Sequence, residues 1–420
     1  MEAVGVFGTS AITAVTAQNT TGVSGTHVVP TNEITAQIRA VLDDFAVEAA
    51  KTGMLATAPI IETVREELST ADFPVVVDPV MVAASGDRLL DQDAEQAYES
   101  LIADATIVTP NADEAAVLTG IDIESESEQI EAGDILLDMG VEAALVKGGH
   151  VGNDPVRDVL VQESTVRTYE HPRVDTRATH GSGCTLASAI ASNLALGADV
   201  PGAVERGLAL MERAVRYPIA AGSGPGSVHH LATLRNQAEK PATVEALRTT
   251  IDNIAESMSA EWSPTHQVTV AGATPFAEDS SDIMIVEPSS SATGREQGST
   301  QSVSIRRSGR LSNVILGLRE HDPTIRFAFQ YPYEPAIENA MGELDWHTVR
   351  HDGSGADADT DSDMRWRIEE LVADLDSTPV AIVDTGDHGA RPMAYVVSES
   401  PQTLVSRVSS LLDAVDSSPD

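Results

Sequence analysis

Cysteine is almost absent from this sequence, and its scarcity excludes several classes of protein. Cys184 is the only cysteine in 420 residues, so the chain can form neither an intrachain disulfide nor a cysteine-based zinc site. No apolar run approaches the roughly 18 residues that a membrane-spanning helix needs. The first residues also lack the basic segment and apolar core of a secretory signal peptide. We therefore expect a cytoplasmic protein with no membrane partner.

Lysine is the second scarce residue. Only three occur, Lys51, Lys147 and Lys240, and the other basic residues are arginines. The 26 basic residues are outnumbered by 65 acidic ones, which gives a formal net charge of −39. That charge repels nucleic acid, so we expect no nucleic-acid partner. Because a surface rich in Asp and Glu stays hydrated in concentrated salt, the composition predicts a cytoplasmic protein of an extreme halophile.

The first part of the chain alternates short apolar strands with segments of helical periodicity. Strands are predicted at 75–79, 105–111 and 143–149, helices at 60–68 and 94–102, and a hairpin at 158–174. Buried strands that alternate with helices form a parallel sheet covered on both faces. The sequence therefore predicts an α/β domain.

The end of this domain is marked by a polar segment, 235–243, which contains Pro241. Proline ends or kinks a helix, so we predict a boundary here. The first domain is expected over residues 1–240. A second, smaller α/β domain is expected over residues 244–420, beginning with a helix at 244–258.

The run His180–Thr185 is the sharpest motif, because its small residues open an apolar helix. The first amides of a helix point at one place, where they hold an anion and stabilise charge on a phosphoryl group in transfer. At this helix start the dipole is expected to lower the thiol pKa of Cys184, which could then take a proton from a substrate hydroxyl. The alternative is a glycine-rich turn with a buried, inert cysteine.

Four polar residues follow closely on predicted strands: Asp78, Asn111, Glu114 and Lys147. Ligands gather at the carboxyl ends of strands in open parallel sheets. Carboxylates there suit Mg²⁺, and a lysine suits a nucleotide phosphate. Each residue alone is as typical of a helix cap or a solvated strand end. Together with the helix start they predict phosphoryl transfer, although the sequence lacks the P-loop pattern.

Residues 1–235 resemble the hydroxymethylpyrimidine/phosphomethylpyrimidine kinases of thiamine biosynthesis, within the ribokinase-like superfamily. The resemblance rests on seven motifs in order: Gly8–Thr20, Lys51–Leu55, Asp78–Met81 with Ser85-Gly86, Thr109–Asn111 with Glu114, Lys147–His150, His180–Thr185 and Gly222–His230. It implies a three-layer α/β/α fold with a mostly parallel sheet. It also implies ATP and Mg²⁺ as cofactors, a pyrimidine alcohol and its phosphate as substrates, and a homodimer.

The same resemblance implies a role for each matching residue. The anion hole would be formed by Gly181, Ser182 and Gly183, with Cys184 as general base. The remaining assignments are Gln18, Met54 and Val80 to the pyrimidine pocket, Lys147, Asn111 and Thr179 to ATP, and Asp78 and Glu114 to the metal.

Family members open with a strand and a glycine-rich segment that wraps the pyrimidine, and this sequence starts after that segment. Met1 would fall in the following helix. A sheet without its first, central strand would leave buried backbone groups unpaired, each at a cost of about 1–3 kcal/mol. We therefore expect that the true start codon lies upstream, and that the chain as printed binds substrate poorly or folds badly.

Residues 244–420 resemble the ThiN domain, a thiamine-phosphate synthase that is often fused to this kinase in archaea. The matching stretches are Glu320–Pro323, Gln330-Tyr331, Trp366 and Asp384–Met393. The glycine-rich turn in the last stretch is expected to cradle a diphosphate. Related synthases carry His and Arg where this sequence has Asn313 and Leu316, which removes an imidazole and a fixed cation.

We therefore favour a ligand-sensing or structural role for this domain over a working synthase. The ligand residues that we predict are Arg310, Asn313, Gly386, Gly389 and Met393. For the whole chain the leading hypothesis is an ATP-dependent kinase of hydroxymethylpyrimidine and its monophosphate. The alternatives are a non-catalytic binding protein for thiamine intermediates and a pyridoxal kinase.

Overall fold

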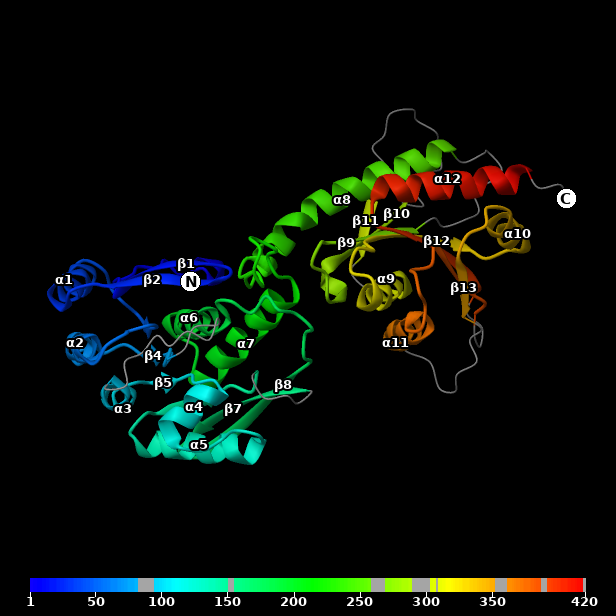
Figure 1. Cartoon of the computed structure of the whole chain (residues 1–420). Helices are drawn as coiled ribbons and strands as arrows, with labels where there is room; N and C mark the ends of the chain where they lie inside the picture. The colour runs from blue at the N-terminus through cyan, green and yellow to red at the C-terminus, as the bar shows by residue number, and fades with distance from the viewer. Residues whose placement is uncertain are drawn as a thin grey trace. The chain divides into compact units, whose positions relative to one another are not determined.

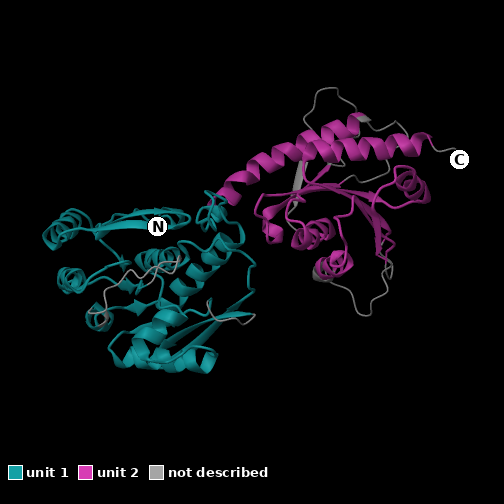
Figure 2. Ribbon diagram, viewed as in Figure 1, with its two compact units in different colours: residues 1–233 teal, residues 234–420 magenta. Residues whose placement is uncertain are grey.

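The computed structural model describes residues 1–81, 94–149, 155–257, 269–288, 303–306, 309–351, 361–386 and 391–417. They form two compact units, residues 1–233 and 234–420 (Figure 2). No helix among these residues is long and apolar enough to cross a membrane.

The first unit is built on a six-stranded sheet with the order β3-β4-β5-β6-β7-β8 (Figure 1). Its strands are β3 (Ala50–Thr52), β4 (Val75–Val77), β5 (Ile107–Val108), β6 (Ala143–Val146), β7 (Val156–Gln162) and β8 (Thr165–His171). Strands β3 to β6 pair in parallel, whereas β7 and β8 are antiparallel. The structure thus confirms the parallel sheet and the hairpin that the sequence predicts.

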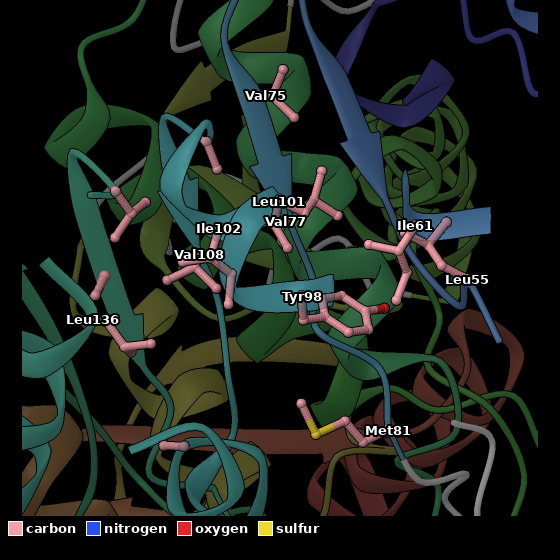
Figure 3. Packing of buried hydrophobic residues seen from close by; sticks show 14 of the residues in the cluster. Leu55, Ile61, Val75, Val77, Met81, Tyr98, Leu101, Ile102, Val108 and Leu136 are labelled. Carbon is pink, nitrogen blue, oxygen red and sulfur yellow. The ribbon is translucent and has the colours of Figure 1, made fainter. Parts of the chain in front are cut away.

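Helices cover both faces of this sheet, because successive strand residues point to opposite sides. Val77 packs into the core under one set of helices, and Val76 into the core under the other. The first set is α1 (Thr31–Leu42), α2 (Ala58–Leu68), α3 (Glu95–Ala103), α4 (Ala112–Thr119) and α5 (Glu126–Asp138), and the second is α6 (Ser182–Ala195) and α7 (Val200–Arg216). The expected three-layer α/β/α fold is confirmed, and Figure 3 shows the first core around Tyr98.

A hairpin of β1 (Ala14–Asn19) and β2 (Gly22–Val28) forms a separate two-stranded sheet after the short η1 (Glu2–Val4). Most of its residues are exposed. Its turn is tied to a distant loop, because the amide of Gly224 donates to Oγ1 of Thr20 at 3.1 Å. The motif Gly222–His230 therefore supports the hairpin turn.

The second unit is a seven-stranded sheet with the order β11-β10-β9-β12-β15-β14-β13. The strands are β9 (Thr269–Ala273), β10 (Ile283–Pro288), β11 (Val303–Arg306), β12 (Phe327–Pro332), β13 (Thr348–His351), β14 (Ala381–Asp384) and β15 (Met393–Ser398), with the short η3 (Ser280–Asp282). Only β13 and β14 pair in parallel among these strands. The second unit is therefore a mixed α/β layer structure.

Helices α8 (Ala232–Ser257), α10 (Pro335–Glu343) and α12 (Pro401–Ser417) cover one face of this sheet, and α9 (Arg310–His321) and α11 (Asp361–Val372) the other (Figure 1). The helix that the sequence placed at 244–258 begins earlier, at Ala232, and contains Pro241. The segment 235–243 is thus helical and not an extended linker. Tertiary packing outweighs the unfavourable helix propensity of this proline.

Gly317 lies where α9 packs against α11, and we predict that only glycine is tolerated there. A Cβ atom at this position would lie 2.7 Å from the carbonyl oxygen of Arg365 and 2.8 Å from Cβ of Ile368. Gly317→Ala should destabilise the second unit by about 1–3 kcal/mol, the usual cost of overpacking. The matched control is Gly342→Ala in α10, where no atom lies within 4 Å of the added Cβ. The free energy of unfolding of this variant should rise by up to about 1 kcal/mol.

The three tryptophans of the chain, Trp262, Trp346 and Trp366, all fall within residues 234–420. Urea unfolding followed by tryptophan fluorescence therefore reports the second unit. Equal midpoints for the two variants would contradict the prediction.

Candidate active site

The carboxyl ends of β4, β5 and β6 meet at one edge of the first sheet, because these strands are parallel neighbours. Asp78 follows β4, and its amide donates to the carbonyl of Thr52 at 3.2 Å. Asn111 and Lys147 follow β5 and β6, and their backbones form a parallel bridge. The structure therefore brings three of the four predicted strand-end residues to the same edge.

Asp78 is the centre of this edge. Its side chain is 2% exposed, with Oδ1 3.6 Å from Nζ of Lys147 and Oδ2 3.8 Å from Nζ of Lys51. Oδ2 is buried and has no hydrogen-bond partner. Lys51 was part of a motif in the sequence but was not predicted as a site residue. The signal that could have identified it is the rarity of lysine in this chain.

The start of α6 faces the same group of charges. Gly181 is the N-cap residue, with a φ of 83°, and no side chain caps the helix. A Cβ atom at Gly183 would lie 3.5 Å from Nζ of Lys147 and 3.7 Å from both carboxylate oxygens of Asp78. The amide of Ser182 donates to the carbonyl of Thr179 at 3.1 Å. The glycine at 183 thus leaves room for a ligand group beside the lysine, while one of the three predicted amides is already engaged.

Cys184, in the first turn of α6, is exposed. Loss of hydration around the sulfur raises its thiol pKa above the ordinary value, and Asp78 adds to this rise. Lys51 and Lys147 lower the pKa, but their effect is smaller in sum. From the helix dipole alone we expected a lowered thiol pKa for Cys184, and that expectation was wrong. The dipole carries about half a charge, and the loss of hydration around the sulfur outweighs it.

Asn111 and Glu114 form a capping box at the start of α4. Oδ1 of Asn111 accepts from the amide of Glu114 at 2.9 Å, and Oε2 of Glu114 accepts from the amide of Asn111 at 2.8 Å. The helix-cap alternative is therefore realised for this pair. Glu114 also lies near the edge that carries Asp78. Burial raises the pKa of the Tyr98 hydroxyl most, and both Asp78 and Glu114 add to this rise.

The residues predicted for the pyrimidine pocket come from three places. Met54 follows β3, and its carbonyl accepts from Oγ1 of Thr13 at 2.8 Å. Val80 is half-buried two residues after Asp78. Gln18 lies on the exposed β1–β2 hairpin, where its side chain accepts from Oγ1 of Thr16 at 3.4 Å. Among the described residues no hydrogen bond joins these three side chains. Thr179, predicted to bind ATP, is exposed.

The donor set at this edge fits a Mg²⁺ ion that also binds phosphate oxygens. The buried Oδ2 of Asp78 lacks a hydrogen bond, which is what a carboxylate ligand of a cation would offer. Among the described residues no group of three or more His, Cys, Asp or Glu could hold a metal ion alone. The remaining ligands would have to come from substrate phosphate and water.

The predicted ligand residues of the second unit gather around Asp384, at the end of β14. Arg310, in the first turn of α9, donates to Oδ2 of Asp384 at 3.2 Å. The amide of Gly386 donates to Oδ1 at 3.0 Å, and Met393 is the partner of Asp384 across the sheet. Gly389 lies outside the described residues.

Asn313 lies three residues after Arg310, which places both on the same side of α9. Leu316, at the position of the synthase arginine, is 4% exposed in the core under α9. This position therefore contributes to packing.

Comparison with known proteins identifies the first unit. Residues 1–229 match the family model of phosphomethylpyrimidine kinase. The chain belongs to the phosphomethylpyrimidine kinase family. Residues 246–410 match the model of thiamine-phosphate synthase ThiN. Both predicted resemblances are confirmed.

Relatives of known name agree with this family. A hydroxymethylpyrimidine/phosphomethylpyrimidine kinase of Streptomyces coelicolor is 45% identical over 231 residues, which are 55% of this chain and 86% of that protein. The corresponding kinase of Bacillus subtilis is 41% identical over 234 residues, with the same two shares. A solved pyridoxal kinase of Bacillus subtilis, an ADP complex, has a TM-score of 0.52 at 30% identity and covers 56% of this chain and 90% of its own.

We predict that Lys51 positions Asp78 and Cys184 in this kinase unit. Lys51→Met should lower the phosphomethylpyrimidine kinase activity by about tenfold or more, because a fixed charge at the reacting centre is lost. The matched control is Lys240→Met, since Nζ of Lys240 lies 3.3 Å from the buried Asp282 of the second unit. Steady-state rates with ATP measure the difference, and circular dichroism checks the fold. Equal rates for the two variants would disprove a positioning role.

Proposed function

We propose that the first unit transfers the terminal phosphoryl group of ATP to hydroxymethylpyrimidine and then to its monophosphate. The observation that carries this proposal is the meeting of the α6 start with Lys147 and Asp78 at one sheet edge. Backbone amides and a lysine together stabilise the charge that spreads over a migrating phosphoryl group. The family and the kinases related to it support the pyrimidine as acceptor.

Each residue has a proposed part in this reaction. As a thiolate, Cys184 takes the proton of the attacking hydroxyl and becomes a neutral thiol, and Lys51 offsets the negative charge of the sulfur before that transfer. The amides of Gly181 and Gly183 bind the phosphoryl group, and the third proposed amide, Ser182, would join them only by sharing the N–H that it donates to the carbonyl of Thr179. The other proposed contacts are Lys147, Asn111 and Thr179 to ATP, and Gln18, Met54 and Val80 to the pyrimidine.

Mg²⁺ is the proposed metal, and when bound it would neutralise charge on the nucleotide phosphates. Asp78 is its best-placed ligand because the carboxylate is buried and one oxygen is unsatisfied. Glu114 is the second proposed ligand, in addition to its role in the capping box. ATP is supported by solved pyridoxal kinases, one of which, from Staphylococcus aureus, was solved with AMP-PCP and pyridoxal and has a TM-score of 0.52 at 28% identity.

Pyridoxal is the second candidate acceptor. Solved pyridoxal kinases of Bacillus subtilis and Staphylococcus aureus have TM-scores of 0.52, and the second was solved with pyridoxal. A binding protein without turnover is less well supported, because Lys147, Glu114 and Cys184 are all retained. Competition between pyridoxal and the pyrimidine in one assay separates the acceptors.

For the second unit we propose a ligand-binding, sensing role around Arg310 and Gly386. The loss of the helix-borne imidazole and the burial of Leu316 favour this role over synthesis. The proposed ligand contacts are Arg310, Asn313, Gly386, Gly389 and Met393. We further propose a cytoplasmic homodimer. Exposed apolar residues of the β1–β2 hairpin, Val15 at 57% and Val28 at 38%, support a contact between subunits.

Cys184→Ala tests the proposed chemistry. Removal of a general base should lower kcat by about 100-fold or more, while the backbone amides still bind nucleotide. The assay supplies ATP, Mg²⁺ and hydroxymethylpyrimidine or its monophosphate in molar KCl and follows the phosphorylated product. Turnover by the unaltered chain together with unchanged turnover by the variant would overturn the role of the thiol. No turnover by the unaltered chain would favour the binding-protein alternative.

A halophilic origin, which we propose from the composition, predicts loss of structure at low salt. With 65 acidic and 26 basic residues, self-repulsion rises when the screening length grows from about 3 Å in 1 M salt to about 10 Å in 0.1 M salt. We expect helical circular dichroism to fall on dialysis from multimolar to about 0.1 M KCl. A fold that stays intact at low salt would argue against this origin.

A further inference from the structure

The second unit holds a histidine that the sequence did not single out, at the carboxyl end of β13. His351 ends β13 and Asp384 ends β14, and the parallel register places the two residues opposite each other. Nδ1 of His351 lies 3.6 Å from Oδ1 of Asp384. The carboxyl ends of parallel strands facing the start of a helix are a common place for ligands. His351 is therefore part of the same cluster as Arg310.

Asp384 lies near both Arg310 and His351 and is the most buried of these three residues. Its side chain is 5% exposed, whereas Arg310 is 36% and His351 14% exposed. Arg310 donates one of its five N–H groups to Asp384, and Nδ1 of His351 lies near the other oxygen of the same carboxylate. A ligand that approaches the cluster thus meets the guanidinium and the imidazole before it meets the carboxylate.

A buried hydroxyl lies beside the same cluster. Tyr395 is fully buried on β15, and its hydroxyl has no partner at ordinary hydrogen-bond geometry among the described residues, although the Arg310 side chain interacts with it more weakly. It lies close enough to Asp384 and Arg310 for both charges to affect its pKa, which burial raises.

We propose that His351, held by Asp384, contacts the ligand of the second unit and, with Arg310, binds its phosphate or diphosphate group. This inference rests on the ligand-binding role proposed above for the second unit. The start of α9 carries Asn313 in place of the synthase histidine, and His351 brings an imidazole to the same cluster from a different element. Arginine and imidazole N–H groups suit phosphate oxygens because a hydrogen bond to an anionic phosphate is charge-assisted.

The test compares His351→Gln with His347→Gln. His347 lies just before β13, at the opposite end of the strand, where Nδ1 is 3.3 Å from Oγ of Ser377. The probes are inorganic diphosphate and hydroxymethylpyrimidine diphosphate, added to the full chain with ADP saturating the kinase unit. Tryptophan fluorescence follows binding, because all three tryptophans fall within residues 234–420. Thermal unfolding of each variant checks the fold.

We expect His351→Gln to raise the Kd for both probes by about tenfold or more, the value of a charge-assisted hydrogen bond. His347→Gln should leave both Kd values unchanged. Histidine NMR signals that are lost in His351→Gln identify this imidazole, and they should shift when diphosphate is added to the unaltered chain. A purely structural role would not produce that shift.

Three results would overturn the proposal. Equal Kd values for the two variants would remove His351 from the site and leave the ligand-binding role standing. Weaker binding of the pyrimidine diphosphate alone would mean that His351 contacts the pyrimidine and not the phosphate. If the unaltered chain bound neither probe, the ligand-binding role and this inference would fail together.

Discussion

The carboxylate of Asp78 lies buried between two ammonium groups, Lys51 at 3.8 Å and Lys147 at 3.6 Å. A buried carboxylate costs several kcal/mol unless cations compensate it, so the edge of the sheet depends on both lysines. Their formal charges leave one positive charge beside the start of α6, where the amides add a partial positive charge. Three parallel strands each contribute one of these residues. The parallel sheet is thus the condition under which a phosphate site can exist at this edge.

Much of this edge could be predicted, because its signals are local in the sequence. The alternation within Val75–Val77 places its residues on the two faces of the sheet, and the small residues of His180–Thr185 mark the helix start. The Asn-x-x-Glu spacing of Asn111 and Glu114 is itself that of a capping box. For this pair the sequence is compatible both with a helix cap and with ATP and metal binding. The contacts in the structure show that the cap is formed.

Other features depend on which strands are neighbours, which a single sequence does not contain. Lys51 becomes a partner of Asp78 only because β3 pairs with β4. The thiol pKa of Cys184 depends on the balance of hydration, Asp78 and two lysines, so an argument from the helix dipole alone had the wrong sign. In the second unit, comparing the α9 sequence with that of related synthases shows that Asn313 replaces a histidine. The same comparison gives no information on His351, because that residue lies on β13 and not on α9.

The few lysines of this chain share one structural setting. All three lysines pair with buried aspartates, Lys51 and Lys147 with Asp78 and Lys240 with Asp282. A compact ammonium fits beside a buried carboxylate where a planar guanidinium would need room for its fork. In molar salt the screening length is about 3 Å, so a net charge of −39 no longer repels an anionic substrate from a distance. Under the proposed kinase function, only cations in contact with the phosphate would then decide whether it binds, and Lys51, Lys147 and the amides of α6 are the groups at this edge that could do so.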